Sequence, residues 1–289
     1  MIARRRKKYK AKEVALGLAF MAPALAVFTV FAFLPLWRIV TWGTFESRQG
    51  GTRYEQVGFD QYREVLTSAT FKEGVWHTVL YVLFTLPVGI VGGILLAVAA
   101  NRRLRGIKLF QTIFSSTIAS TAAVTAVVFF FLLNPVVGIF DVDWLQDKHM
   151  ALFAVSLTSM WQNLGLTFVI TLAGLQAIPE EVVEAATLDG FGPIRRLFRI
   201  TLPLLSPTLL FLLVILTVSG FQTFAQIDVL TQGGPGRSTE VLLWKIFEAN
   251  SADRVTIGSV MSVGLFVITA LVVFLQFVIL ERRVHYGNE

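Results

Sequence analysis

The chain has 289 residues, of which 55% are hydrophobic and 15% are charged, and its mean hydropathy is +0.68. Soluble domains carry about 25% charged residues, so this composition excludes an ordinary soluble domain and indicates a polytopic membrane protein. The chain has no cysteine, which excludes disulfides and thiolate metal sites.

Six apolar segments are long enough to cross a bilayer, which takes roughly 20 apolar residues in a helix. In chain order they cover residues 14–36, 75–100, 110–133, 151–177, 204–227 and 257–280. We therefore predict an all-α, polytopic membrane protein whose six transmembrane helices form one domain over residues 14–280.

The net charge of +6 is unevenly distributed over the loops. The side that holds both termini and the loops after the second and fourth segments has 16 Lys and Arg residues, and the other side has 9. Cytoplasmic loops carry the excess of Lys and Arg, so the first side is predicted to be cytoplasmic. Residues 1–13 are then a basic cytoplasmic N-terminus, expected to touch anionic lipid rather than nucleic acid. Residues 281–289 are a cytoplasmic C-terminus.

The loop over residues 178–203 joins the fourth and fifth segments and is predicted to fold as two short helices. Pro179 suits the first position of a helix, and Pro193 suits the start of the next one. Gly190 suits the left-handed residue that ends a helix. One face of the first helix is expected to carry Val182, Ala185, Ala186 and Asp189. The two alanines on this face would allow the close approach of another surface.

The same loop follows the pattern Glu-Ala-Ala, three residues, Gly, nine residues, Ile-x-Leu-Pro. Its fixed positions here are Glu184, Ala185, Ala186, Gly190, Ile200, Leu202 and Pro203, and Asp189 beside Gly190 completes the predicted coupling set. This pattern resembles the coupling-loop signature of the permease subunits of bacterial type I ABC importers. A second stretch over residues 221–239, with Gly233-Gly234-Pro235 at its centre, is similar to the carbohydrate-uptake branch of these importers.

The resemblance implies the transmembrane fold of a type I importer and an assembly of several subunits. A second homologous permease would pair with this chain, two copies of a cytoplasmic ABC ATPase would dock on the coupling loops, and an extracytoplasmic solute-binding protein would deliver the sugar. The chain itself would be non-catalytic and bind no cofactor or metal, because ATP and Mg²⁺ belong to the ATPase. In agreement, it has no Gly-x-x-x-x-Gly-Lys-Ser/Thr loop. The expected location is the bacterial inner membrane.

Polar side chains recur at helical spacing within the fourth and fifth segments. Hydroxyl and amide groups both donate and accept hydrogen bonds, which suits a neutral polyol. Small Ser and Thr residues also join helices to each other, whereas large amides usually face the protein interior or a water-filled path. The predicted substrate path consists of Ser159, Gln162, Asn163, Thr167, Ser219, Gly220, Gln222, Thr223 and Gln226.

Three other functions compete with a sugar permease. An ion-coupled carrier usually places a titratable group in the membrane, and none lies deep in a predicted span. A membrane-embedded enzyme would need a catalytic cluster, but the three histidines are scattered. Residues 192–196 and 282–286 resemble glycerol-phosphate permeases, so a glycerol-3-phosphate or glycerophosphodiester permease is the main alternative. The predicted cargo is nevertheless a neutral di- or oligosaccharide, because a phosphate would need a cationic partner.

Overall fold

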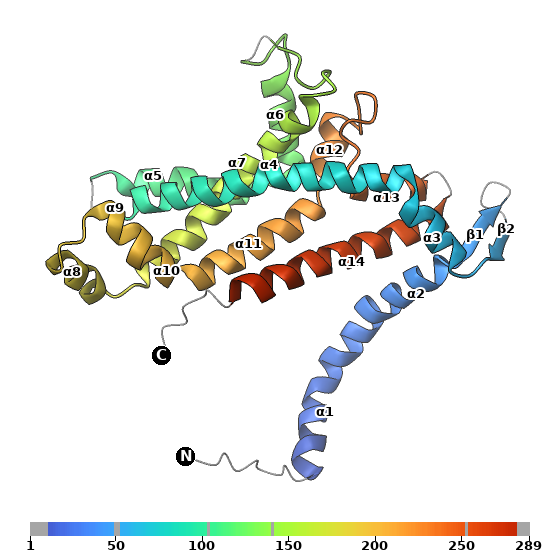
Figure 1. The fold of residues 1–289 in the computed structure, drawn as a ribbon, viewed down its shortest axis with the longest axis horizontal. Coiled ribbons are helices and arrows are strands. Elements are labelled where there is room, and N and C mark those ends of the chain that lie inside the picture. The colour runs from blue at the N-terminus through green and yellow to red at the C-terminus, as the bar shows by residue number, and fades with distance from the viewer. Residues whose placement is uncertain (1–10, 49–52, 103–104, 140–141, 252–253, 282–289) are drawn as a thin grey trace.

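The computed structural model describes residues 11–48, 53–102, 105–139, 142–251 and 254–281. The predicted terminal segments 1–13 and 281–289 lie almost entirely outside these ranges. The described chain is nearly all helical, as predicted, and forms an elongated bundle from which the N-terminal helix projects (Figure 1).

The chain begins with one long helix, in which α1 (Ala11–Phe28) continues through the π-helical turn η1 (Thr29–Phe33) into α2 (Leu34–Trp42). A short antiparallel hairpin of β1 (Phe45–Arg48) and β2 (Arg53–Gln56) follows, with Phe45 opposite Gln56. Next come α3 (Asp60–Thr67) and α4 (Ala69–Ala100). Ser68 caps α4, because its Oγ accepts a hydrogen bond of 3.2 Å from the backbone N–H of Phe71.

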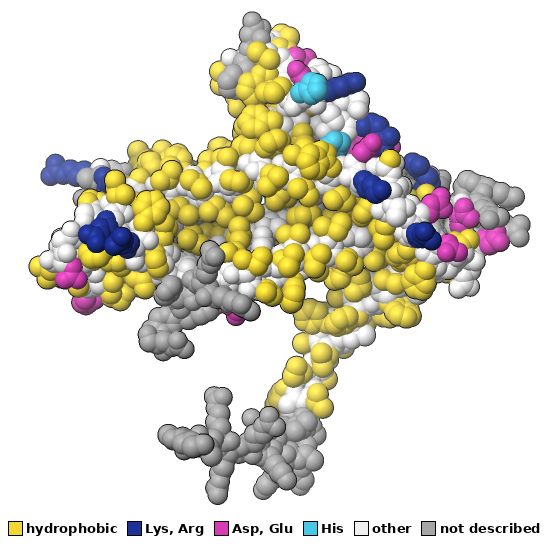
Figure 2. Space-filling view, in the orientation of Figure 1, with side chains coloured by type: hydrophobic (Ala, Val, Ile, Leu, Met, Phe, Trp, Pro, Cys, Tyr) yellow, Lys and Arg dark blue, Asp and Glu magenta, His cyan; other side chains and the backbone are white. Residues whose placement is uncertain are grey.

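The centre of the bundle is the contact between α4 and α7 (Ala151–Gln176). Glycines of α4 let the two helices approach closely: Gly89 faces Asn163, and Gly93 faces Thr167. The last helix, α14 (Val255–Leu280), packs against α3, α11 (Ser206–Phe221) and α13 (Leu242–Ser251). Hydrophobic side chains cover the long face of the bundle, and charged side chains gather at its ends (Figure 2).

Four described helices are long and apolar enough to cross a membrane, and two bent helix pairs raise the number to six. The prediction of six spans is therefore confirmed only if each bent pair counts as one span. The first span is longer than predicted, because the apolar helix runs on to Trp42. The predicted spans at 75–100, 151–177 and 257–280 coincide with α4, α7 and α14, although α4 begins six residues earlier.

The third predicted span, over residues 110–133, is not one straight helix. It consists of α5 (Ile107–Ser115), the 3₁₀ turn η2 (Ser116–Ala119) and α6 (Ala122–Leu133), with a bend of 107°. Local hydroxyl groups explain the break. Ser116 Oγ donates to the carbonyl of Ile113 at 2.7 Å, and Thr121 caps the new helix by accepting from the N–H of Val124 at 3.3 Å.

The fifth predicted span, over residues 204–227, is also divided. The helix α11 ends at Phe221, and the short helix α12 (Ala225–Leu230) follows as a separate element. At the other end, Pro207 lies in the first turn of α11 and cannot donate a backbone hydrogen bond to the preceding turn. The helical segment Pro193–Leu204 therefore meets α11 at 71°.

The loop over residues 178–203, called the central loop below, has the two predicted helices. The first is α8 (Glu180–Leu188), and the second is a continuous segment of α9 (Pro193–Arg196), the π-helical turn η3 (Leu197–Thr201) and α10 (Leu202–Leu204). Pro193 begins the second segment, as predicted. Pro179 is the cap of α8 rather than its first residue. The end of the bundle beside this loop is the loop end, and the opposite end is the far end.

Candidate functional site

A cavity of about 530 Å³ lies in the bundle where the two bent helix pairs meet α4 and α7. Its walls come from α4, α7, η2, the start of α6, the end of α11 and α12. The lining residues are Tyr81, Thr85, Thr117, Ile118, Ser120, Ala122, Ser159, Gln162, Asn163, Leu166, Ser219, Gly220, Gln222, Thr223, Phe224, Ala225 and Gln226.

The helical repeat of α7 and the two chain breaks bring the polar groups together. Ser159, Gln162 and Asn163 follow one another at i, i+3 and i+4, so they lie on one face of α7. The break after α11 turns Thr223 towards the same space, and the break after η2 supplies Ser120. The breaks after η2 and after α11 thus both contribute residues to the cavity wall.

A chain of hydrogen bonds crosses one wall of the cavity. Tyr81 Oη and Ser159 Oγ are 2.6 Å apart, and Gln226 Nε2 donates to the same Ser159 Oγ at 3.1 Å. Thr223 Oγ1 in turn donates to Gln226 Oε1 at 3.1 Å. These four side chains, called the hydroxyl–amide relay below, join α4, α7 and α12. On another wall, Gln162 Nε2 donates to the carbonyl of Ser120 at 3.0 Å.

The cavity lining is uncharged and combines polar groups with apolar surface. No Asp, Glu, Lys, Arg or His is among the described residues that line it. The available groups are hydroxyls and amides, each able to donate and to accept. Leu166 and Phe224 add apolar surface. Such a lining matches a molecule rich in hydroxyl groups, and it offers no countercharge to an anion.

Eight of the nine residues predicted for the substrate path line this cavity. Thr167 does not: it is fully buried against Gly93, where it packs α7 on α4. The predicted path lacked four polar residues of the lining, which are Tyr81, Thr85, Thr117 and Ser120. A usable signal was present for the first two, because Tyr81 and Thr85 are four residues apart and are the only polar side chains between residues 79 and 100 of α4.

The central loop is the second candidate site, and Gly190 determines its shape. Gly190 has φ +79°, the left-handed conformation that was predicted for it. Its N–H donates to the carbonyl of Thr187 at 3.1 Å, and the N–H of Phe191 donates to the carbonyl of Ala186 at 3.0 Å. These two bonds form the Schellman motif that ends α8.

Side chains then fasten the second segment of the loop to α8. Arg196 Nη1 donates to Thr187 Oγ1 at 3.0 Å, and the guanidinium of Arg195 lies 4.6 Å from the ring centre of Phe191. The two helices of the central loop therefore form one small unit at the loop end of the bundle.

The predicted docking face of α8 needs one correction. Ala186 is 4% exposed, so its side chain is not accessible on the predicted face. Glu184, Ala185 and Asp189 are exposed, and so is the neighbouring Leu188, at 88%. The remaining signature residues, Ile200, Leu202 and Pro203, are half-buried in the segment that leads to α11.

A multi-span helical bundle with an uncharged polar cavity and a structured loop at one end defines a membrane transport subunit. Residues 89–286 match the family described as "Binding-protein-dependent transport system inner membrane component". The chain belongs to this family, and it is a non-catalytic, multi-pass permease subunit of an ABC importer in the inner membrane. Family membership thus decides against an ion-coupled carrier and against an enzyme.

Similar proteins of known name agree with this assignment. The chain is 32% identical over 275 residues to the sn-glycerol-3-phosphate transport system permease protein UgpA of Yersinia pestis, covering 91% of this chain and 93% of that protein. It is 33% identical over 279 residues to UgpA of Agrobacterium fabrum, covering 92% and 95%. The fold matches a subunit of a bacterial ABC transporter that imports the acidic polysaccharide alginate, with a TM-score of 0.78, 22% identity and coverage of 94% and 96%.

Proposed function

We propose that this chain is the permease subunit of an ABC importer whose cargo is a neutral di- or oligosaccharide. The observation that carries the proposal is the uncharged lining of the cavity, in which hydroxyl and amide groups surround about 530 Å³. A sugar that leaves water needs its hydroxyl groups matched by donors and acceptors, because an unpaired polar group in an apolar environment is costly.

A glycerol-3-phosphate permease is the second candidate, and the names of the relatives favour it. A phosphate group in a low-dielectric site requires cationic partners, usually Arg or Lys. The described lining supplies neither. If the cargo is a phosphate, its countercharge has to come from the paired permease, since the path would lie between two subunits.

The central loop is the proposed contact with the ATPase. Glu184, Ala185 and Asp189 are exposed on α8, and Leu188 offers a fully accessible apolar side chain beside them. The remaining members of the proposed coupling set, Ile200, Leu202 and Pro203, connect this surface to α11. With this assignment, the loop end faces the cytoplasm, as the distribution of Lys and Arg also favours. ATP and Mg²⁺ would bind to the ATPase.

The remaining partners follow from the family. A second homologous permease, two ATPase copies and an extracytoplasmic solute-binding protein complete the proposed importer. The fold of a relative was solved together with an alginate-bound periplasmic protein, which supports a delivering partner on the far side of the membrane.

The test is to isolate the complete complex after mild solubilisation and reconstitute it in proteoliposomes with its binding protein. ATP hydrolysis is then measured with neutral disaccharides and oligosaccharides, and with sn-glycerol-3-phosphate. Stimulation by a neutral sugar is the expected result. Stimulation by glycerol-3-phosphate alone would favour the second candidate, and an active transporter that lacks any ATPase subunit would contradict the whole assignment.

A further inference from the structure

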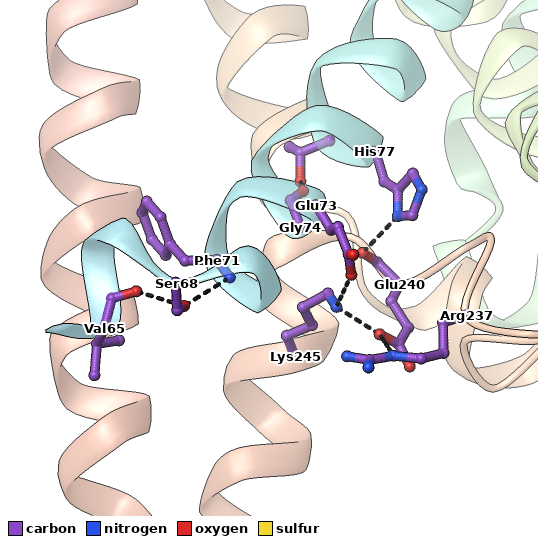
Figure 3. A network of polar contacts seen from close by, with 10 residues as sticks. Val65, Ser68, Phe71, Glu73, Gly74, His77, Arg237, Glu240 and Lys245 are labelled. Atoms are coloured by element: carbon purple, nitrogen blue, oxygen red, sulfur yellow. Dashed lines mark hydrogen bonds and ion pairs between the residues drawn. The ribbon is translucent and has the colours of Figure 1, made fainter.

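A cluster of charged side chains lies at the far end of the bundle, outside the cavity and the central loop. Figure 3 shows Glu240 between Arg237 and Lys245, with Glu73 and His77 approaching from α4. Lys245 Nζ is 2.6 Å from Glu240 Oε2, and Arg237 Nε is 2.9 Å from the same oxygen. Glu73 Oε2 is 3.8 Å from Lys245 Nζ. The name far-end clamp is used below for Glu73, Arg237, Glu240 and Lys245.

The central pair of this clamp is buried, and its outer members are not. The side chains of Lys245 and Glu240 are 2% and 8% exposed, whereas those of Arg237 and Glu73 are 57% and 54% exposed. Removing one member of a buried ion pair leaves an uncompensated charge in a low-dielectric site. Glu240 and Lys245 therefore depend on each other much more than on the two exposed partners.

Neutral hydrogen bonds reinforce the same seam between α4 and the segment that leads into α13. Thr78 Oγ1 accepts from the N–H of Leu242 at 2.9 Å. His77 Nδ1 is 3.2 Å from the carbonyl oxygen of Glu240, which can only accept, so the ring proton is on Nδ1. A Cβ atom on Gly74 would lie 3.0 Å from Lys245 Cδ, so this glycine makes room for the lysine.

Hydrogen bonds within the turn between α12 and Glu240 join its two ends. Thr231 Oγ1 and Thr239 Oγ1 are 2.7 Å apart, and Thr239 Oγ1 also lies 2.7 Å from the carbonyl oxygen of Gly234. Two residues other than glycine have positive φ in this turn, Gln232 at 49° and Arg237 at 70°. Such a conformation persists where its surroundings hold it. These contacts connect Glu240 to the end of α12 through an internally hydrogen-bonded turn.

The two elements that meet at the far-end clamp, α4 and the segment that begins with α12, both continue to the cavity. On α4, Glu73, His77 and Tyr81 recur every four residues and share one face, so the clamp lies about 12 Å from the tyrosine along the helix. On the other side, α12 carries Gln226. The hydroxyl–amide relay joins Tyr81 and Gln226 through Ser159. The clamp and the relay thus join the same two elements, α4 and the segment of α12, turn and α13.

We propose that Glu240 and Lys245 are positioning residues for the transport path. Their buried ion pair fixes the start of α13, which Thr78, His77 and Glu73 of α4 contact. The turn that leads back from Glu240 to α12 is thereby kept in place, and with it Gln226 and Thr223 in the cavity wall. The inference rests on the proposed function, because it takes the cavity as the path of the cargo. A pair of charged residues outside the cavity would then determine the positions of uncharged residues that line it.

The chain has no cysteine, so an introduced thiol is the only one that it carries, and its labelling is read on this subunit after the subunits are separated by electrophoresis. Ala225→Cys places the thiol on α12 in the cavity lining and removes no hydrogen bond of the relay. The rate of its reaction with a maleimide is measured in the detergent-solubilised complete complex. This measurement needs neither cargo nor ATP, so it stands or fails separately from the identity of the sugar.

Glu240→Gln and Lys245→Met are each expected to raise the labelling rate about fivefold or more, because one buried charge then loses its partner. Arg237→Gln is the matched control: it removes an exposed partner of the same oxygen and is expected to change the rate by less than about twofold. The double variant Glu240→Gln/Lys245→Met leaves no charge of the pair and is expected to label more slowly than either single variant, since the two effects are coupled.

A second measurement separates positioning from mere stability. In proteoliposomes, the single variants are expected to raise the sugar concentration for half-maximal stimulation of ATP hydrolysis more than they lower its basal rate. Unchanged labelling in assembled Glu240→Gln and Lys245→Met complexes would overturn the proposal. If these variants do not assemble, Glu240→Asp and Lys245→Arg keep the charges but change the reach of the side chains, and unchanged labelling in both would overturn it equally.

Discussion

Gly89 of α4 lies directly against Asn163 of α7: a Cβ atom on Gly89 would be 2.6 Å from the Cβ of Asn163. Asn163 lines the cavity, so the absence of a side chain at Gly89 lets the helices approach and places this amide in the wall. The distance between α4 and α7 is therefore set at the level of the candidate transport path.

Gly89→Ala is expected to push α7 away and to reduce sugar-stimulated ATP hydrolysis about tenfold or more, because overpacking a close helix contact costs about 1–3 kcal/mol. Gly92→Ala is the matched control on the same helix. Its new methyl group would meet the end of the flexible Leu164 side chain, which can move aside. Transport assays of both variants test the difference, and equal loss in the two would contradict this account.

Asn163→Ala is expected to raise the sugar concentration for half-maximal stimulation about two- to tenfold, the effect of losing one hydrogen bond of about 0.5–1.5 kcal/mol. Thr167→Val is the control one turn further along α7. The Thr167 hydroxyl is buried without a hydrogen-bond partner, so its loss is expected to leave cargo affinity unchanged. If Thr167→Val weakened cargo binding as much as Asn163→Ala, the cavity wall would be wrongly assigned.

Gly190→Ala and Gly192→Ala form a matched pair in the central loop. A new methyl group would meet nothing within 4 Å at either position, but only Gly190 has positive φ. A residue other than glycine in this conformation costs about 1–2 kcal/mol, so Gly190→Ala is expected to weaken association with the ATPase about tenfold. Gly192→Ala is expected to bind normally. Co-purification of the ATPase with each variant, at equal membrane insertion, decides the question.

A pH effect is expected where α3 meets the end of α2. Tyr62 Oη donates to the carbonyl of Val40 at 2.8 Å, and burial raises the pKa of Tyr62 above its ordinary value of 10.0. The neutral phenol is thus the form that the fold favours. Its contribution is complete below about pH 10 and is lost as the pH rises through the folded pKa. Comparing the tyrosinate absorbance of wild type and Tyr62→Phe during an alkaline titration measures the shift, and a Tyr62 titration at or below pH 10.0 would contradict it.

Hydrophobic length alone was enough to locate the straight helices α4, α7 and α14, because membrane-spanning segments differ so strongly from loops in composition. Hydrophobic length does not reveal a bend within an apolar segment. The hydroxyls of Ser116 and Thr121 break a run that is still apolar on average, so the third span was predicted as continuous. The division between α11 and α12 was missed for the same reason.

The candidate site was predictable to the extent that it lies on regular helices. Helical spacing grouped Ser159, Gln162 and Asn163 correctly, since all three lie on the uninterrupted α7. Thr167 continues the same spacing, yet it packs against Gly93, because only the position of α4 decides which part of a polar stripe meets a cavity. Ala186 shows the same limit, since the periodicity of α8 placed it on the accessible face with Ala185, whereas it is buried in the folded chain.

The helical connection between the central loop and the cavity has one bend, at Leu205. On one side lies the segment Pro193–Leu204, and on the other lies α11, about 24 Å long, whose last residues include the cavity-lining Gly220. Leu205 itself is 1% exposed and packs in a cluster with Phe168, Leu172 and Leu175, so the bend lies in the core. The second helical segment of the central loop is therefore joined to the cavity by α11 alone, with one bend, at a leucine that is buried in the core.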